Sequence, residues 1–502
     1  MTEKENITHS EVVPAAPLER TYTELEKQPE IREAITSLGY QYTREQERRV
    51  VKKLDWHVLS FLSALYMLSY LDRGNIGNAN TAGLSKSLAI SNSQYQWVLT
   101  AFYISYITSQ FLTLLWKVFP PRYYVPCVVI GWGIISACTA AINNWGALMT
   151  LRFLLGIFEA AYGPGVPYYL SYFYYRHEIG RRTGIFVAVT PLASAFSGAL
   201  AFGITYHKLT IPSWRVLFLV EGCPTILMGL IGFFAIPNDA GSCRFLTEEE
   251  KKIAVARTVR QTGLTDRGGH KLDWSELFST LIDFKSIVPA VMYLSINVGF
   301  SSLPVFLPAI IEGMGFTSIN AQGLSAPPYL VTAFMVIAAS FLSDKLLQRG
   351  YLIAIISSVG AAGYLILAIC ETTAVRYFAV YLATAGVFPC VALHVAWVGN
   401  NQGSDTKRST AYVLLNVIGQ CGPVIGTRIF PSSDGPYYKK GFYVSFGFQC
   451  AVAVLALVLR TYLARKNKML DERFGPAEGN PLDPEDALGL EGENNPNFRY
   501  IL

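Results

Sequence analysis

About twelve apolar stretches, each long enough to cross a bilayer as a helix, constrain the fold of this sequence more than any other feature. Inside the hydrocarbon core only helices and closed barrels satisfy their own backbone hydrogen bonds. The first group comprises residues 54–73, 95–115, 123–142, 146–170, 183–205 and 215–236. The second comprises residues 286–311, 323–343, 351–370, 375–399, 408–430 and 441–463. The sequence therefore predicts an all-α membrane protein, a bundle of twelve helices in two six-helix halves.

The composition agrees with this fold class. Of the 502 residues, 51% are hydrophobic and only 15% are charged, whereas soluble domains carry roughly 25% charged residues. The net charge of +5 is small, and the basic residues lie in short loops rather than on one soluble face, so no nucleic-acid binding is expected. The eight cysteines include no Cys-x-x-Cys pair, and seven lie in or beside apolar stretches. We interpret them as small hydrophobic residues and expect no metal site.

Three polar segments flank and divide the spans. They are a head at residues 1–53, a central loop at 237–285 and an acidic tail at 464–502. The two six-helix halves then cover residues 54–236 and 286–463. The polar head does not resemble a cleavable signal peptide, and we expect head and tail to be loosely ordered.

The central loop contains a helix signal of its own. Thr247, followed three residues later by Glu250, is typical of a capping box. Ile253, Ala256 and Val259 then fall on one face. We expect an amphipathic helix here, either at the membrane surface or as a solvated linker.

Lys and Arg in short loops predict the orientation, since they favour the cytoplasmic side. With twelve spans, all of the main basic clusters fall on one side of the membrane: residues 48–53, 117–122, 176–182, 345–349, 407–408 and 465–468. Lys439 and Lys440 are exceptions on the opposite side. We therefore expect both termini and the central loop to be cytoplasmic.

Two charges lie inside the fourth span. Arg152 and Glu159 are seven residues apart, so both project from one face, with Gly156 between them. A charged residue at the centre of a membrane helix costs roughly 2.5–3.5 kcal/mol on insertion scales. We therefore expect both side chains to face the protein interior or a watery cavity, where they either act in function or form an ion pair that only holds helices together.

Asp72 and Arg73 are two further charged residues in an apolar setting, at the end of the first predicted span. Adjacent residues point about 100° apart on a helix, so the two cannot simply pair with each other across one face. Each needs a partner elsewhere, and Arg152 and Glu159 are the nearest candidates. Alternatively, both end the helix at the interface and reach out to water.

Other polar groups and helix breaks also fall at membrane depth. Asn297, Asn416 and Gln420 are typical of cross-links between helices, and His394 is more typical of a core residue than of a proton carrier. Pro and Gly interrupt the fourth, seventh and eleventh spans, which suits either a cavity-lining segment or tight packing. We find no Walker sequence, no His-Glu-x-x-His and no Gly-x-Ser-x-Gly, and therefore expect neither an enzyme nor a cofactor.

Several motifs, in matching order and spacing, resemble the major facilitator superfamily and its anion:cation symporter branch. YLDRGNIGNA at residues 70–79 and RFLLGIFEAAYGPG at 152–165 are similar to the branch signatures of the first and fourth helices. Residues 213–250 are similar to fungal members related to allantoate permease, and NNPNFRYIL at 494–502 resembles the tails of fungal members. The similarity runs from about residue 50 to the end of the sequence.

The superfamily's loop motifs are only partly present. Between spans two and three, WKVFPPRYY keeps only two basic residues of the usual signature. After span eight, SFLSDKLLQRG retains Asp344, Lys345 and Arg349, which the resemblance implies take part in the conformational change.

The resemblance implies a mechanism as well as a fold. It places anion binding on Arg73 and Arg152 and proton coupling on Asp72 and Glu159. We add Asn75 and Asn416 as further candidate substrate contacts. Arg suits this role because its planar fork holds a carboxylate or sulfonate by two bonds. A carboxyl group removed from water binds a proton more readily. The expected function is proton-coupled uptake of a small organic anion by alternating access of the two halves.

Several alternatives stay open. The same fold permits export of an anionic metabolite by antiport, and a non-transporting nutrient sensor is a further reading. The substrate could be a carboxylate, a nicotinate-like acid, a ureide or a sulfonate. Aromatic residues near the helix breaks could stack on a flat ring or simply pack: Tyr162, Tyr168, Tyr169 and Phe173. We expect a monomer in the plasma membrane, with the vacuolar and endoplasmic reticulum membranes as alternatives.

Overall fold

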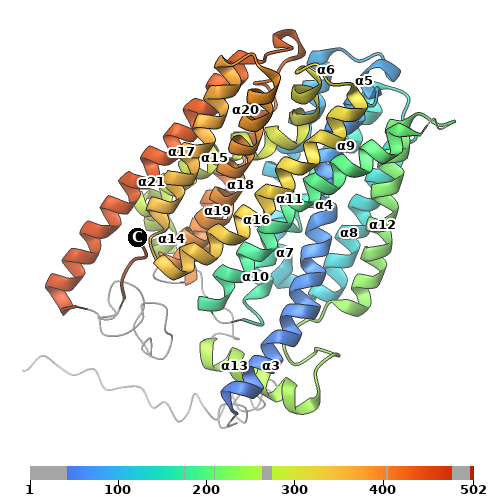
Figure 1. Ribbon diagram of the computed structural model, residues 1–502. Coiled ribbons are helices and arrows are strands. Elements are labelled where there is room, and N and C mark those ends of the chain that lie inside the picture. The colour runs from blue at the N-terminus through green and yellow to red at the C-terminus, as the bar shows by residue number, and fades with distance from the viewer. Residues whose placement is uncertain (1–41, 175, 208–209, 263–273, 403–404, 477–497) are drawn as a thin grey trace, which may run out of the picture.

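The computed structural model describes residues 42–174, 176–207, 210–262, 274–402, 405–476 and 498–502, and over these ranges its regular elements are helices (Figure 1). The first half contains α3 (Arg44–Leu54), η1 (Asp55–Leu59), α4 (Ser60–Thr81), α5 (Leu84–Ser87), α6 (Asn92–Thr108), η2 (Gln110–Leu114), α7 (Leu115–Val118), α8 (Pro121–Thr139), α9 (Trp145–Ala160), η3 (Gly163–Gly165), α10 (Val166–Leu170), α11 (Arg176–Tyr206) and α12 (Ser213–Ala235). The segment between the halves contributes α13 (Glu248–Thr262) and α14 (Trp274–Ile282). The second half contains α15 (Phe284–Glu312), α16 (Ser318–Leu346), α17 (Arg349–Ile369), α18 (Thr373–Asn400), α19 (Asp405–Gly419), α20 (Cys421–Gly426), η4 (Ser432–Asp434) and α21 (Lys439–Phe474).

A bundle of twelve membrane crossings, as the sequence predicts, fits the elements of the two halves. Seven of the described helices are long and apolar enough to cross a membrane by themselves: residues 182–206 of α11, and α12, α15, α16, α17, α18 and α21. The other crossings are shorter, more polar or built from pieces. Among them, the fourth is α9 followed by the 3₁₀ turn η3 and α10, and the eleventh is α19 followed by α20. The predicted breaks in these two spans are therefore present, and they fall at Gly163–Gly165 and at Gln420.

The first crossing is longer than the apolar pattern predicts. Helix α4 continues to Thr81, although the apolar run ends near residue 73. Asn75 and Asn78 stay in the helix because they are buried among neighbouring helices. Asp72 and Arg73 therefore lie in the middle of α4, and the alternative that they end the helix at the membrane interface is wrong.

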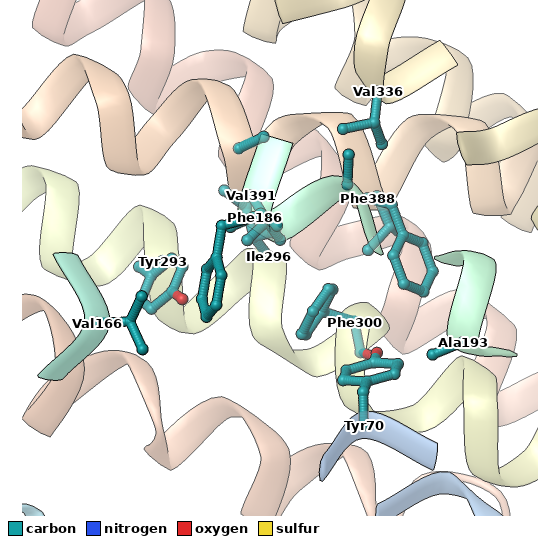
Figure 2. Close-up of a cluster of buried hydrophobic side chains, with 14 of the residues drawn as sticks. Tyr70, Val166, Phe186, Ala193, Tyr293, Ile296, Phe300, Val336, Phe388 and Val391 are labelled. Carbon is teal, nitrogen blue, oxygen red and sulfur yellow. The ribbon is translucent and has the colours of Figure 1, made fainter. Parts of the chain in front are cut away.

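The two halves pack against each other along three main pairs of helices. Helix α11 lies against α16 (Figure 1) and against α18, and α4 lies against α15. Gly77 of α4 allows the contact with α15, because a Cβ there would lie 2.3 Å from the carbonyl oxygen of Val305. Aromatic rings continue the contact: Tyr70 lies 5.4 Å from Phe300, which lies 5.0 Å from Phe388 (Figure 2).

The predicted helix in the central loop is α13. The backbone N–H of Thr247 donates to Glu250 Oε2 at 3.0 Å and that of Glu250 to Thr247 Oγ1 at 3.4 Å, which is the expected capping box. Ile253 and Ala256 are buried, and ion pairs join Glu250 to Lys53 of α3 at 2.7 Å and Arg257 to Glu47 of α3 at 2.8 Å. Its apolar face therefore packs on the end of the bundle. The side chain of Val259 lies outside the described residues.

The last residues of the sequence dock on the second half. The side chains of Asn401 and Asn467 each exchange two hydrogen bonds with the backbone of Ile501 and Tyr500, respectively, at 2.8–2.9 Å. Trp397 also donates to the Ile501 carbonyl, at 2.8 Å. Residues 498–502 are thus held by α18 and α21. The predicted loose order of the head and tail is wrong for their described parts, because α3 begins at Arg44, α21 continues to Phe474 and residues 498–502 are docked. Residues 1–41 and 477–497 lie outside the described residues.

Candidate functional site

A cavity of about 1410 Å³ lies between the two halves. Its lining extends from the centre of α4 and α15 to Asn238–Gly241 and to Val255 of α13, so it reaches the end of the bundle that carries α3 and α13. The central part is lined by tyrosine and phenylalanine rings and by side-chain amides: Tyr66, Tyr70, Tyr103, Tyr106, Phe186, Tyr293, Phe300, Asn297, Asn416 and Gln420. Such a mixture of flat apolar walls and a few polar groups is typical of a small-molecule site.

Arg73 presents a guanidinium group to this cavity. Its Nη2 lies 2.8 Å from Glu159 Oε2, and its Nε donates to the same oxygen at 3.1 Å. The rings of Phe102 and Tyr106 lie 5.2 and 5.0 Å from the guanidinium carbon, within the range of a cation–π contact. The aromatic contacts and the ion pair together hold the cation in place at low exposure.

Glu159 is buried, and its two oxygens differ. Ser69 Oγ donates to Oε2 at 3.0 Å, in addition to the two bonds from Arg73. Oε1 has no hydrogen-bond partner among the described residues. Gly156 brings this part of α9 close to α6, because a Cβ there would lie 2.4 Å from the Phe102 carbonyl oxygen. The predicted contact between the first and fourth spans is therefore made by Arg73 and Glu159.

Asp72 points away from the cavity, into the first half. Its carboxylate accepts hydrogen bonds from Ser136 of α8 and, at 3.4 Å, from Thr225 of α12. Arg152 lies nearby, and its Nη1 donates to the main-chain oxygen of Asp72 at 3.4 Å, while Nη2 has no partner among the described residues. In this conformation neither Asp72 nor Arg152 lines the cavity.

The two predicted asparagines differ in position. Asn416 lines the cavity, and its amide donates to the Tyr412 carbonyl at 2.9 Å. Asn75 is fully buried outside the cavity lining, and neither polar atom of its side chain has a hydrogen-bond partner among the described residues.

Other residues singled out in the sequence lie outside the centre of the cavity. Asp344 pairs with the buried Arg349 at 3.1 Å where α16 turns into α17, and Lys345 is exposed beside it. His394 is buried outside the cavity lining, with Nε2 2.9 Å from the Pro289 carbonyl. Of the aromatic residues near the fourth-span break, Tyr168 lines the cavity, whereas Tyr162, Tyr169 and Phe173 are buried outside its lining.

Among the buried charges near the site, sequence reasoning missed Glu221 of α12. It is 2% exposed, and its Oε1 accepts a hydrogen bond from Ser197 Oγ at 3.4 Å. The available signal was the same one that pointed to Glu159, namely an acid within an apolar stretch.

Side chains of both halves close the bundle at the end opposite the cavity mouth; we call this the closed end. Gln322 of α16 donates to Thr81 at 3.0 Å and accepts from Thr205 at 2.7 Å. Thr100 lies 3.2 Å from Thr427, and further contacts join Ser318 to Thr81 and Ser432 to Asn92 at 2.8 and 2.9 Å. The molecule is thus open at one end and closed at the other.

The family model described as the Major Facilitator Superfamily matches residues 62–427. The chain belongs to this superfamily. Among its relatives is an uncharacterised transporter of Schizosaccharomyces pombe, to which this chain is 32% identical over 433 residues. The aligned region covers 86% of this chain and 89% of the relative. This chain is 30% identical over 462 residues to the high-affinity nicotinic acid transporter of Saccharomyces cerevisiae, covering 91% of this chain and 85% of the relative.

A solved structure supports the same fold. The superfamily proton:xylose symporter XylE, bound to 6-bromo-6-deoxy-D-glucose, matches with a TM-score of 0.62 over 83% of this chain and 96% of that one, at 14% sequence identity. The major facilitator fold predicted from the sequence is confirmed. The family and the named relatives make this chain a membrane transporter.

Proposed function

We propose that this transporter couples the entry of protons to the uptake of a small organic anion by alternating access of its two halves. The observation that carries the proposal is the guanidinium of Arg73, which lines the central cavity and is paired with the buried carboxylate of Glu159. An anion that leaves water for a low-dielectric cavity needs a cation there. Arg73 can supply it through two parallel hydrogen bonds.

The ion pair explains why a proton would be required. In the described state Glu159 already occupies Arg73, so an incoming anion competes with it for the same donors. A proton on Glu159 removes the competing charge and frees the guanidinium. The proton and the anion therefore favour each other's binding, which is the thermodynamic requirement for symport. Asp72 acts in this proposal without touching the substrate, because its carboxylate faces α8 and α12.

The cavity walls favour an anion with a flat ring. Tyr66 and Phe186 stack on each other with centroids 4.2 Å apart, and both rings line the cavity with Tyr106 and Tyr293. Asn416 and Asn297 offer amide groups on the opposite half. A pyridine carboxylate fits this chemistry, and a relative named as a nicotinic acid transporter supports it. Other carboxylates, ureides and sulfonates are weaker candidates.

The proposed orientation puts the cavity mouth, α13 and the acidic tail in the cytoplasm. We keep the domain boundaries proposed from the apolar spans: a head at 1–53, halves at 54–236 and 286–463, a loop at 237–285 and a tail at 464–502. In this orientation the head, the loop and the tail are cytoplasmic. We place the protein in the plasma membrane as a monomer.

Export by antiport is the second candidate function, since the same cavity would load its substrate from the cytoplasm.

The test is uptake of radiolabelled anions into cells that express the protein, at pH 5 and pH 7, with and without an uncoupler. The panel contains nicotinate, allantoate, pantothenate, biotin, a short carboxylate and an alkyl sulfonate. We expect accumulation of nicotinate at acid pH that the uncoupler abolishes. In Glu159→Gln, accumulation should be lost while exchange of labelled for unlabelled nicotinate persists.

Two results would contradict the proposal. Accumulation that is insensitive to the uncoupler in the wild type would exclude proton coupling. A flat panel in cells, together with proton-driven accumulation in inverted vesicles, would favour export. Glu371→Gln, an exposed carboxylate on a loop, serves as the matched control and should behave as wild type.

A further inference from the structure

Glu221 is a buried carboxyl group that does not line the cavity. It lies on α12, and Ser197 Oγ of α11 donates to its Oε1 at 3.4 Å, while Oε2 has no hydrogen-bond partner among the described residues. No Lys or Arg that the structure describes approaches it within ion-pair distance, although burial of an isolated negative charge is costly.

Glu221 belongs to a buried cluster whose charges do not balance. The cluster contains the buried guanidinium of Arg152 and the buried carboxyl groups of Asp72, Glu159 and Glu221, and it includes Arg73, which lines the cavity and pairs with Glu159. The charged groups that act on Glu221 are Asp72 of α4 and Arg152 of α9. Thr225 links Asp72 to the α12 backbone beside Glu221, because its hydroxyl donates to the Asp72 carboxylate at 3.4 Å and to the main-chain oxygen of Glu221 at 2.9 Å. With three acids and two bases, the cluster is neutral only when one carboxyl group holds a proton.

A chain of hydrogen bonds leads from Glu221 to the closed end. Asn78 Nδ2 donates to Ser197 Oγ at 2.9 Å, and Ser197 in turn donates to Glu221, so both donors point toward the carboxylate. The main-chain oxygen of Asn78 accepts from Gln322 Nε2 at 3.4 Å. Gln322 lies on α16 of the second half and also binds Thr81 and Thr205. The chain therefore crosses from one half to the other.

Close packing makes this part of the interface sensitive to small shifts. Gly198 follows Ser197 on α11, and a Cβ there would lie 2.5 Å from Ser325 Oγ and 2.9 Å from the Gln322 carbonyl oxygen. A movement of Ser197 is thus transmitted to α16, since interiors packed at this density do not absorb it.

We propose that Glu221 is a proton-sensing positioning residue that controls the closed end through Ser197, Asn78 and Gln322. The ionised carboxylate strengthens the two donors directed at it, because hydrogen bonds to a charged acceptor are roughly twice as strong as neutral ones. This holds Asn78 in place and favours closure. A proton on Glu221 weakens the chain and favours opening. The inference rests on the proposed function, in which protons arrive from the side of the closed end.

The experiment measures the closed end directly, without a substrate. Spin labels are attached to cysteines at Asn92→Cys and Ser432→Cys, whose native side chains are 2.9 Å apart across the halves, in a background without the eight native cysteines. Pulsed EPR in nanodiscs then gives the distance distribution between pH 8 and pH 5. We expect the longer distances to gain population as the pH falls. In Glu221→Gln we expect the longer distances to be populated at every pH, with no pH response.

The outcomes separate the two proposals. Glu371→Gln, the control with the same chemical change, should keep the parent's pH response. If Glu221→Gln keeps that response too, or if the parent shows none, the role of Glu221 is overturned. If Glu221→Gln does not fold, Ser197→Ala decides, because it breaks the chain and should reduce the pH response; an unchanged response overturns the inference. Failure of the uptake assay alone would overturn the proposed function and leave this measurement intact.

Discussion

At the scale of single residues, the position of Arg73 depends on its shape as much as on its charge. The flat guanidinium lies near the rings of Phe102 and Tyr106 while two of its nitrogens reach one carboxylate oxygen. A lysine ammonium keeps the charge but loses the fork and the planar contact. The same features would serve a substrate carboxylate once Glu159 is neutral.

Arg73→Lys is therefore expected to weaken nicotinate uptake by raising KM about 10-fold or more, which corresponds to about 1.4 kcal/mol of lost binding. Uptake kinetics at pH 5 check this. Arg215→Lys, at the start of α12 and outside the cavity lining, provides the control and should leave KM unchanged. A KM equal to wild type in Arg73→Lys would argue against direct contact with the anion.

Glu250 gives a pH-dependent prediction outside the membrane spans. Burial raises the pKa of its carboxyl group, but hydrogen bonds from Lys53 and Thr247 outweigh this, so the pKa lies below its usual value. Its contribution to docking of α13 is thus present above the ordinary carboxyl pKa of about 4.3 and is lost as the pH falls through the lower folded-state value. Because the pair is partly exposed, we expect about 0.5–1 kcal/mol.

Hydrogen exchange of the α13 amides measures this docking. Glu250→Gln should increase exchange near neutral pH and make little difference under acid conditions where wild-type Glu250 is protonated. Glu248→Gln, on the same helix, is the control because Glu248 pairs only with the nearby Lys251. Equal exchange in wild type and Glu250→Gln at neutral pH would show that the ion pair does not hold α13.

At the scale of single residues, the sequence predicted that charged side chains are buried, but not the direction in which each one points. The cost of charge in lipid was enough to predict that Arg152 and Glu159 are buried. It could not tell that Arg73 faces the cavity and Asp72 faces away, because neighbours on a helix diverge by about 100° and the packing of α8 and α12 decides which face is inside. The same packing conceals Asn75.

At the scale of helices and segments, hydropathy predicted the crossings better than their ends. Helix α4 runs eight residues past the predicted end at 73, to Thr81, and α21 runs past 463 to Phe474. Polar residues end an apolar pattern, but they do not necessarily end a helix. In α4 the polar side chains are buried among neighbouring helices, and α21 keeps its backbone hydrogen bonds beyond the apolar stretch. The Thr247 capping box and the Gly163–Gly165 turn were predicted correctly, but the break predicted in the seventh span is wrong, because α15 runs unbroken through Pro304 and Pro308.

The docked segment at residues 498–502 is expected to stabilise the second half. Asn401 and Asn467 satisfy the backbone of Tyr500 and Ile501, and both of these residues are buried. Each hydrogen bond of this kind contributes about 1 kcal/mol. Deleting residues 498–502 should therefore lower the melting temperature in detergent by several degrees.

The matched variants for this deletion are Asn401→Ala and Asn467→Ala, which should reproduce part of the loss. Replacing Lys285 by Ala, which removes a contact with the ring and hydroxyl of Tyr500, should have a smaller effect than the deletion. An unchanged melting temperature after the deletion would mean that the docking contributes nothing to stability.

At the scale of the whole molecule, the cavity mouth and the closed end describe one state of an alternating-access cycle. The mouth lies at the end that carries α3 and α13, and the basic clusters of the sequence predict that this end faces the cytoplasm. The orientation predicts that an epitope inserted in the head or in the central loop is inaccessible to antibody in intact cells and becomes accessible after permeabilisation. An epitope beside η4, at the closed end, should be accessible without permeabilisation; the reverse pattern would invert the proposed topology.

The Arg73–Glu159 pair also affects how tightly proton flow is coupled to anion transport. With neither ligand bound, the pair is neutral; with both a proton on Glu159 and an anion on Arg73, the site is neutral again. Either ligand alone leaves one uncompensated charge, which costs several kcal/mol to enclose in a low-dielectric interior. Transporters with only one of the two ligands bound would thus reorient most slowly. The same two side chains that bind the anion and the proton would therefore also limit uncoupled proton flow across the membrane.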